Sequence, residues 1–231
     1  MDARVVSDRP RPVQKTLTRA PLREGSRGVA RVPARAGRPS TAHDCTATPL
    51  LAMKVKPLDQ PLGEVRAELE RIRHPFRIAV IRAKNGFNIG AIVRTAHSFL
   101  AREIILVGVE RWYERAAMGM QRYENVREVP DEDAFLALAA EHAWKLIVFE
   151  KEVSSAGLWD CELPEDAVLV FGNEDSGVPD SIVRAAYEVV AIPMYGINHS
   201  YPISAAAAIA MAEWARRYYA GGRIVVPAAG A

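Results

Sequence analysis

From about residue 58 onwards, the pattern of hydrophobic and polar positions is typical of a chain in which strands and helices alternate. Short apolar runs predict five strands, at residues 76–82, 103–109, 145–149, 167–171 and 187–192. Apolar residues at helical spacing predict helices at residues 58–73, 88–100 and 131–142, a short helix from 179, and a long one at 203–219. The sequence therefore predicts an α/β fold, with a mostly parallel sheet and helices on both faces.

Individual residues support the ends of these helices. Asp131 is a suitable N-cap for the third helix, and Pro179 suits the first position of the fourth. Gly221 and Gly222 are expected to end the last helix. The run at residues 103–109 is apolar without a break, as is typical of a parallel strand covered on both faces.

The first 52 residues differ in composition from the rest. They hold ten Lys and Arg against four acids, a balance of +6, whereas the remaining residues hold 20 against 24, or −4. Residues 1–52 show no apolar periodicity, so we expect either a disordered basic extension or a mis-assigned start, with Met53 as the true first residue. A transit peptide and an arm that holds RNA phosphates stay open as further readings.

Composition narrows the classes of protein. No apolar run approaches the roughly 20 residues of a membrane helix, which predicts a soluble, cytoplasmic protein. The two cysteines, Cys45 and Cys161, and the scattered histidines predict neither a disulfide framework nor a metal site. Neither the glycine fingerprint of dehydrogenases nor the phosphate-binding loop of P-loop enzymes occurs, which argues against both classes.

Three polar segments follow predicted strands, and we expect them at the sheet edge where open α/β proteins bind ligands. They are Asn88-Ile-Gly-Ala-Ile-Val-Arg-Thr-Ala96, Leu169-Val-Phe-Gly-Asn-Glu-Asp-Ser-Gly-Val178 and residues 192–207, which begin Ile-Pro-Met-Tyr-Gly. Taken alone, the turn at Gly172 is sufficiently explained by a tight strand-to-helix connection. Six of the nine residues at 204–212 are alanine, which indicates close packing against the last helix.

Together and in this order, the three segments resemble the motifs of the SpoU/TrmH branch of the SPOUT RNA methyltransferases, over about residues 76–218. The resemblance implies a methyltransferase domain at residues 76–222, and we expect an N-terminal helix at 53–75 before it and a flexible tail at 223–231 after it. It also implies a C-terminal trefoil knot and a homodimer. The implied activity is methyl transfer from S-adenosylmethionine (SAM) to a ribose 2′-hydroxyl of tRNA or rRNA.

The resemblance also assigns roles to residues. The implied SAM-binding residues are Gly172, Glu174, Ile192, Met194, Ser200 and Tyr201. The implied catalytic residues are Asn88, Arg94, Glu174 and Ser200. A guanidinium stays protonated, so we expect Arg94 to stabilise the developing alkoxide and to clamp a neighbouring RNA phosphate. Asn88 would orient Arg94 or the ribose.

One position departs from the family pattern. Pro202 stands where the family's third motif has an asparagine, and proline offers neither a side-chain donor nor a backbone N–H. A catalytically silent RNA-binding protein with the same fold is therefore the alternative function. Basic residues near the first motif, taken as weak candidates for contacts with the RNA backbone, are Arg73, Arg77, Arg82 and Lys84. Arg66 and Arg71 belong to the same stretch.

Overall fold

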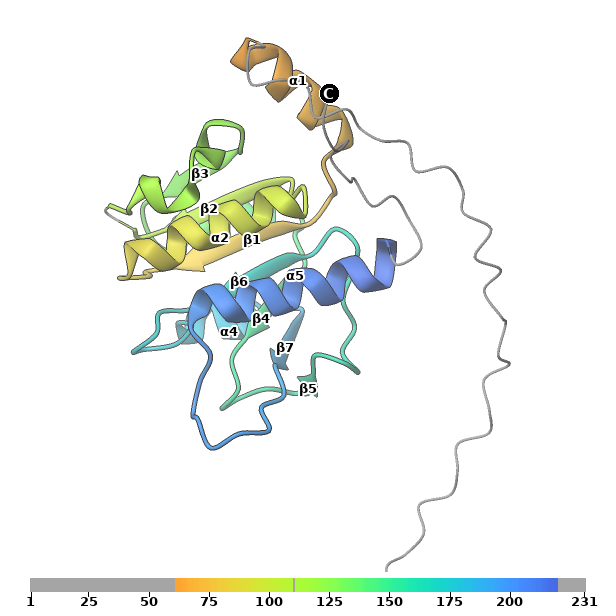
Figure 1. Ribbon diagram of the computed structural model, residues 1–231. Helices are drawn as coiled ribbons and strands as arrows, with labels where there is room; N and C mark the ends of the chain where they lie inside the picture. Colours follow the sequence, from red (N-terminus) through yellow and green to blue (C-terminus); the bar gives the residue numbers. More distant parts are fainter. Residues whose placement is uncertain (1–60, 110, 220–231) are drawn as a thin grey trace, which may run out of the picture. The chain divides into compact units, whose positions relative to one another are not determined.

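A parallel sheet organises the described part of the chain, with its strands in the order β3-β2-β1-β6-β4-β7-β5 (Figure 1). The structure is a computed structural model that describes residues 61–109 and 111–219. Every neighbouring pair in this sheet is parallel. All of its strands therefore end at the same edge.

The strands are β1 (Arg77–Ile81), β2 (Glu103–Val107), β3 (Val126–Val129), β4 (Leu146–Phe149), β5 (Ala156–Gly157), β6 (Val168–Phe171) and β7 (Glu188–Ala191). The α-helices are α1 (Leu62–Ile72), α2 (Gly86–Ser98), α3 (Glu132–Glu141), α4 (Asp180–Arg184) and α5 (Ile203–Tyr219). Two 3-10 helices, η1 (Glu114–Ala117) and η2 (Met120–Arg122), lie between β2 and β3.

Helices cover both faces of the sheet, which buries the central strands completely and explains their unbroken apolar runs. On one face, α2 and α5 lie side by side (Figure 1) and pack residues such as Ile92 and Trp214 against β1 and β6. On the other face, α3 and α4 pack Phe135 and Ile182 against Ala79 and its neighbours. The α/β architecture predicted from the sequence is therefore confirmed.

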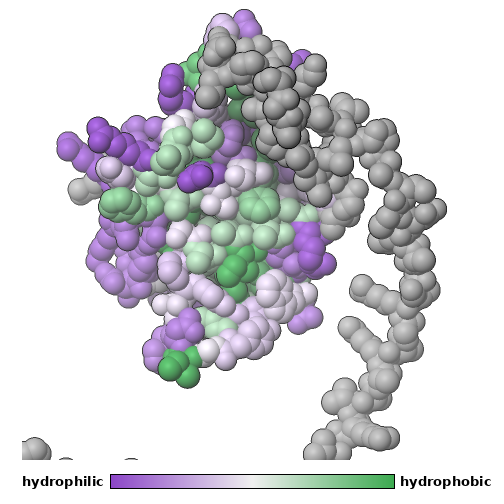
Figure 2. Space-filling view, viewed as in Figure 1, coloured by the Kyte–Doolittle hydropathy of each residue, from purple (hydrophilic) through white to green (hydrophobic). Residues whose placement is uncertain are grey.

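The outer surface of α2 and α5 carries few charges at its centre. Figure 2 shows pale and green residues there and purple ones towards its margins. Large apolar side chains on and near α2 are exposed: Phe87, in the first turn of α2, is 64% exposed, and Met118, which follows η1, is 66% exposed. Such a patch on a soluble protein often marks a contact surface.

The predicted element boundaries need small corrections. Helix α2 begins at Gly86, two residues before Asn88, because the Asn85 side chain caps it by accepting from the Phe87 N–H. Pro179 lies just outside α4 instead of at its first position. The cap at Asp131 is confirmed, since its side chain accepts from the Ala134 N–H at 2.9 Å.

Other sequence predictions have mixed outcomes. The predicted strands correspond to β1, β2, β4, β6 and β7, while β3 and β5 escaped prediction. Helix α1 falls within the predicted N-terminal helix at 53–75, of which residues 53–60 lie outside the described residues. The predictions for residues 1–52, for Gly221 and Gly222 and for the tail at 223–231 also lie outside them.

Candidate active site

A cavity of about 820 Å³ opens at the carboxyl edge of the sheet. The ends of β4 and β6 and the loops after β6 and β7 form its walls. Its lining contains all of the residues predicted to bind SAM: Gly172, Glu174, Ile192, Met194, Ser200 and Tyr201. Two segments separated by some twenty residues in sequence therefore meet in one hollow, at the position expected for a ligand in an open α/β sheet.

The loop after β6 closes tightly on itself. Asn173 and Gly177 exchange two backbone hydrogen bonds, at 2.9 and 3.0 Å, and Gly177 has a positive φ of 67°. A Cβ on Gly172 would lie 2.2 Å from the Gly177 carbonyl carbon, so only glycine fits there. The Asn173 side chain is buried and donates to the Arg82 carbonyl at 2.6 Å. The loop is thereby held against the end of β1.

Asn88 joins the three polar segments. Its Nδ2 donates to Glu174 Oε1 at 2.9 Å, and its Oδ1 accepts from the Ser204 hydroxyl at 2.9 Å. Glu174 follows β6 and Ser204 lies in the first turn of α5, so one amide connects the start of α2 to the loop after β6 and to the start of α5. Asn88 itself is absent from the cavity lining. The structure thus gives Asn88 a positioning role behind Glu174.

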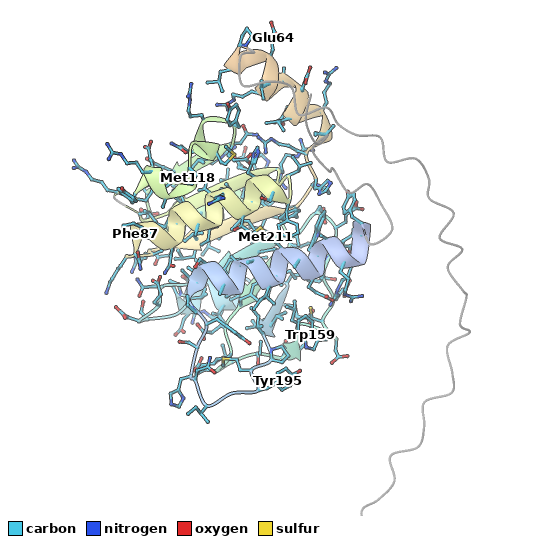
Figure 3. The ribbon with its side chains drawn as sticks, in the orientation of Figure 1. Glu64, Phe87, Met118, Trp159, Tyr195 and Met211 are labelled. Atoms are coloured by element: carbon cyan, nitrogen blue, oxygen red, sulfur yellow. The ribbon has the colours of Figure 1, made fainter. Side chains whose placement is uncertain are left out.

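The loop between β7 and α5 forms the outer wall. Met194, His199, Ser200 and Tyr201 line the cavity, and the Tyr201 hydroxyl donates to the Pro193 carbonyl at 3.1 Å. Tyr195, at 88% exposed, stands at the tip of this loop and points away from the sheet (Figure 3). The cavity side of the loop is therefore held by internal contacts, while its tip is open to solvent.

Pro202 lies at the end of this loop and lines the cavity. Its carbonyl accepts from the Ala205 and Ala206 N–H groups at 2.9 and 3.0 Å, which are the first hydrogen bonds of α5. A residue that flanks a helix needs no N–H partner of its own. Proline therefore fits the backbone here, although it supplies no side-chain group to the cavity.

Carboxylates give the cavity an acidic wall. Glu150 follows β4 directly, and its Oε2 accepts from the Val178 N–H at 3.1 Å. Burial, and then the hydrogen bond with the neighbouring Glu152 carboxyl, raises the pKa of Glu150. Lys151, between these two acids, donates to the His199 carbonyl and ties β4 to the loop after β7. With Glu174, three glutamates line the hollow.

Arg94 lies apart from the cavity lining, on the exposed side of α2. It is six residues after Asn88, or roughly 9 Å along a helix that rises about 1.5 Å per residue. Among residues 61–109 and 111–219, no hydrogen bond or ion pair engages its guanidinium. Arg94 is thus free to meet an outside group such as a phosphate.

The four basic residues predicted to contact RNA separate into different environments. Arg73 is buried and binds Glu124 at 2.7 Å and the Ala101 carbonyl at 2.8 Å, so it is not available to RNA. Arg77 begins β1 and lies at the amino edge of the sheet. Arg82 and Lys84 lie at the opposite, carboxyl edge, where they pair with Glu132 and Asp175.

Sequence reasoning missed three residues of the site, namely Glu150, Asn173 and Ser204. The sequence could have indicated each of them, because Glu150 follows a predicted strand at the carboxyl edge and the other two lie inside the quoted motifs.

Among the residues that the structure describes, no group of three or more His, Cys, Asp or Glu side chains is placed to hold a metal ion. None of the described helices is long and apolar enough to cross a membrane.

Comparisons with known proteins agree with this geometry. The model of the SpoU rRNA Methylase family matches residues 75–212. A tRNA (guanosine(18)-2′-O)-methyltransferase of Aquifex aeolicus is 25% identical over 171 residues, which cover 72% of this chain and 81% of that protein. A 23S rRNA (adenosine(1067)-2′-O)-methyltransferase of Streptomyces laurentii is 34% identical over 137 residues, which cover 56% of this chain and 50% of that protein.

A solved structure shares the fold. The SpoU methyltransferase AviRb from Streptomyces viridochromogenes, in complex with AdoMet, superposes with a TM-score of 0.57 at 24% sequence identity. The match covers 66% of this chain and 61% of that one.

Proposed function

Since the chain belongs to the SpoU rRNA Methylase family, we propose that it transfers the methyl group of SAM to a ribose 2′-hydroxyl of tRNA or rRNA. SAM-dependent methylation of RNA is the activity that its family and relatives share. The observation that carries the proposal is that one cavity at the carboxyl edge gathers the second and third motifs, while Asn88 connects the first motif to both.

The cavity fits SAM in size, lining and charge. Its volume of about 820 Å³ lies within the usual range for small-molecule sites, roughly 300–1,000 Å³. Phe171, Val190 and Ile192 offer an apolar wall, and the tight turn at Gly172 exposes backbone groups. The glutamates of the acidic wall complement a cationic ligand.

The protein's own residues would then align and activate the ribose. When bound, SAM supplies a sulfonium methyl group that needs no further activation. Glu174, fixed by Asn88, and Ser200 stand in the cavity wall and would help to hold the cofactor and the ribose. Arg94, on the exposed side of α2, would hold an RNA phosphate that takes the 2′-hydroxyl proton, and it would stabilise the negative charge that develops on the 2′-oxygen as this atom takes the methyl group and S-adenosylhomocysteine leaves.

The proposal extends to features that the family resemblance suggests: a trefoil knot that includes α5, a homodimer and a cytoplasmic location. The alanine-rich first half of α5 supports the knot and the homodimer, because alanines let another segment approach the helix backbone closely. The apolar outer surface of α2 and α5 supports the dimer.

The test is transfer of tritiated methyl groups from SAM to total RNA of a strain that lacks the gene. We expect label in nuclease-resistant 2′-O-methyl dinucleotides. Arg94→Ala should lower transfer by about 10²–10³-fold, as expected when a charge-stabilising group is lost, while SAM affinity stays within a few-fold. Arg184→Ala, which removes an exposed arginine of α4, is the matched control.

Two negative outcomes have different meanings. Full transfer by Arg94→Ala would refute the role of Arg94 but leave the reaction standing. No transfer by the wild-type protein, with SAM still bound, would favour the silent RNA-binding alternative and point to Pro202.

A further inference from the structure

A second cavity, of about 750 Å³, lies at the amino edge of the same sheet. Four arginines from four segments line it: Arg66 of α1, Arg77 of β1, Arg102 before β2 and Arg127 of β3. We call it the arginine cavity. Arg77 and Glu103 are the first residues of neighbouring strands, whereas the SAM cavity lies beyond the last residues. The two hollows are therefore at opposite edges, about one strand length apart, or roughly 16 Å for five residues.

Positive charge exceeds negative charge in this cavity. Its lining holds two carboxylates, Glu103 and Glu124. Glu124 is fully buried and already bound by Arg73 and His97, each at 2.7 Å. Glu103 forms ion pairs with both Arg127, at 2.6 Å, and Arg77, at 3.7 Å.

The other two guanidinium groups have weaker partners. Arg102 approaches Glu70 at 3.6 Å, beyond hydrogen-bond distance. Arg66 donates to Asn125 Oδ1 at 3.2 Å and to the Arg122 carbonyl at 3.4 Å, and no described carboxylate pairs with it. Glu103 thus pairs with two of the four guanidinium groups and Glu70 with a third, while Arg66 pairs with no described carboxylate.

Many of the N–H donors are unused. Each guanidinium carries five N–H groups, and Arg77 Nε is buried without a hydrogen-bond partner among the described residues. Burial lowers the pKa of Arg77, and the positive charges of Arg102 and Arg127 add to the lowering, whereas the Glu103 and Asp166 carboxylates oppose it. An anion with several oxygens would satisfy these donors and relieve the repulsion between the arginines.

We propose that the arginine cavity binds a backbone phosphate of the RNA substrate, away from the nucleotide that is methylated. This inference rests on the proposed RNA substrate and adds an anchoring site to it. Guanidinium groups match phosphate geometry and contribute positioning without reading sequence. RNA that occupies both sites must span the two edges of the sheet, so the cavity favours a large folded substrate over a short oligonucleotide.

The experiment measures binding of fluorescently labelled bulk tRNA across a range of salt concentrations. The test protein is the double variant R102Q/R127Q, whose arginine side chains are 43% and 46% exposed and so contribute little to stability. R66Q, at a residue without a described carboxylate partner, is a second variant that leaves the strands untouched. R184Q, on the far side of the sheet from α2 and α5, is the matched control.

Each phosphate contact contributes close to one unit to the slope of log affinity against log salt. We expect R102Q/R127Q to weaken tRNA binding at least tenfold at low salt and to lower the slope by about one to two. R66Q should lower it by about one, and R184Q should leave it unchanged. SAM affinity should be the same in all four proteins.

Unchanged tRNA affinity and slope in R102Q/R127Q and R66Q would overturn the proposal, as would a wild-type protein that does not bind tRNA. Inorganic phosphate is titrated in parallel. Saturable phosphate binding that these variants abolish, with tRNA binding intact, would overturn it by assigning the cavity to a free anion. Altered tRNA binding without any methyl transfer would support the anchoring site while the proposed reaction fails.

Discussion

At the scale of single residues, the site depends on the absence of a side chain at Gly172 and on the hydrogen bonds of Asn173. Gly172 permits the backbone of residues 172–178 to close, since a Cβ there would meet the backbone of Gly177 and Val178 within 2.4 Å. Asn173 then uses its amide three times: Nδ2 donates to Arg82, and Oδ1 accepts from the Asp175 and Ser176 N–H groups. These hydrogen bonds fix the conformation of the loop that forms one wall of the cavity.

We expect Gly172→Ala to destabilise the protein by about 1–3 kcal/mol, the usual cost of overpacking a closed site, and to abolish measurable SAM binding because the loop must move. Thermal unfolding and calorimetric titration with SAM measure the two effects. Gly63→Ala is the control, since nothing lies within 4 Å of a Cβ there. Normal SAM binding by Gly172→Ala would show that the loop closure is dispensable.

Arg73 shows where sequence reasoning about single residues fails. Its position beside other basic residues predicts an exposed contact, yet its partner Glu124 comes from a segment 51 residues away. Nothing local in the sequence reports such a pairing. By contrast, the residues predicted to bind SAM do line one cavity, because each lies in a recognisable motif in a loop that follows a strand at the carboxyl edge.

At the scale of elements, strands buried on both faces were predictable and edge strands were not. β1 and β6 are continuous apolar runs because helices cover them on both sides. β3, at one end of the sheet, places the exposed Arg127 and Glu128 in its middle, and β5 has only two residues. Such short segments are strands only because a neighbour pairs with them, which their own patterns do not indicate.

The end of α5 is fixed to the start of β1 by aromatic contacts. His74, just before β1, stacks on Tyr219 with ring centroids 3.9 Å apart and lies 5.4 Å from Trp214. Burial lowers the pKa of His74, and its Nδ1 has no described hydrogen-bond partner. Folding therefore favours the neutral imidazole, and protonation opposes this contact.

This contact predicts acid sensitivity. Because the pKa of His74 is lower in the folded than in the unfolded state, its contribution to stability is present above its ordinary value of 6.5 and is lost as pH falls through the folded value. His74→Phe keeps an aromatic ring and should flatten the loss of stability between pH 7 and pH 5. Urea midpoints across this range measure it, with the exposed His142→Phe as control. Parallel curves for wild type and His74→Phe would contradict the assignment.

At the scale of the whole molecule, the described part of the chain divides its tasks between the edges and faces of one sheet. The carboxyl edge holds the SAM cavity, the amino edge holds the arginine cavity, and the outer surface of α2 and α5 stays apolar. Only the cavity at the carboxyl edge was predictable from the sequence, since the loops that line it follow predicted strands. The arginine cavity combines α1, β1, β2 and β3, and its assembly requires the strand order of the folded sheet.

The apolar outer surface leads to the last prediction, that two copies of the chain associate through α2 and α5. Ala208 is half-buried on α5 and lies outside the hydrophobic core, while Phe87 and Met118 stand exposed on the α2 side (Figure 3). In a twofold interface the same surface of both copies is buried, so one substitution introduces the added charge twice. We expect Ala208→Arg to convert a dimer to a monomer in sedimentation equilibrium, whereas Ala140→Arg, on the exposed side of α3, should leave the dimer intact. A wild-type monomer would refute association altogether, and a dimer that survives Ala208→Arg but not Ala140→Arg would move the interface to the face that α3 and α4 cover.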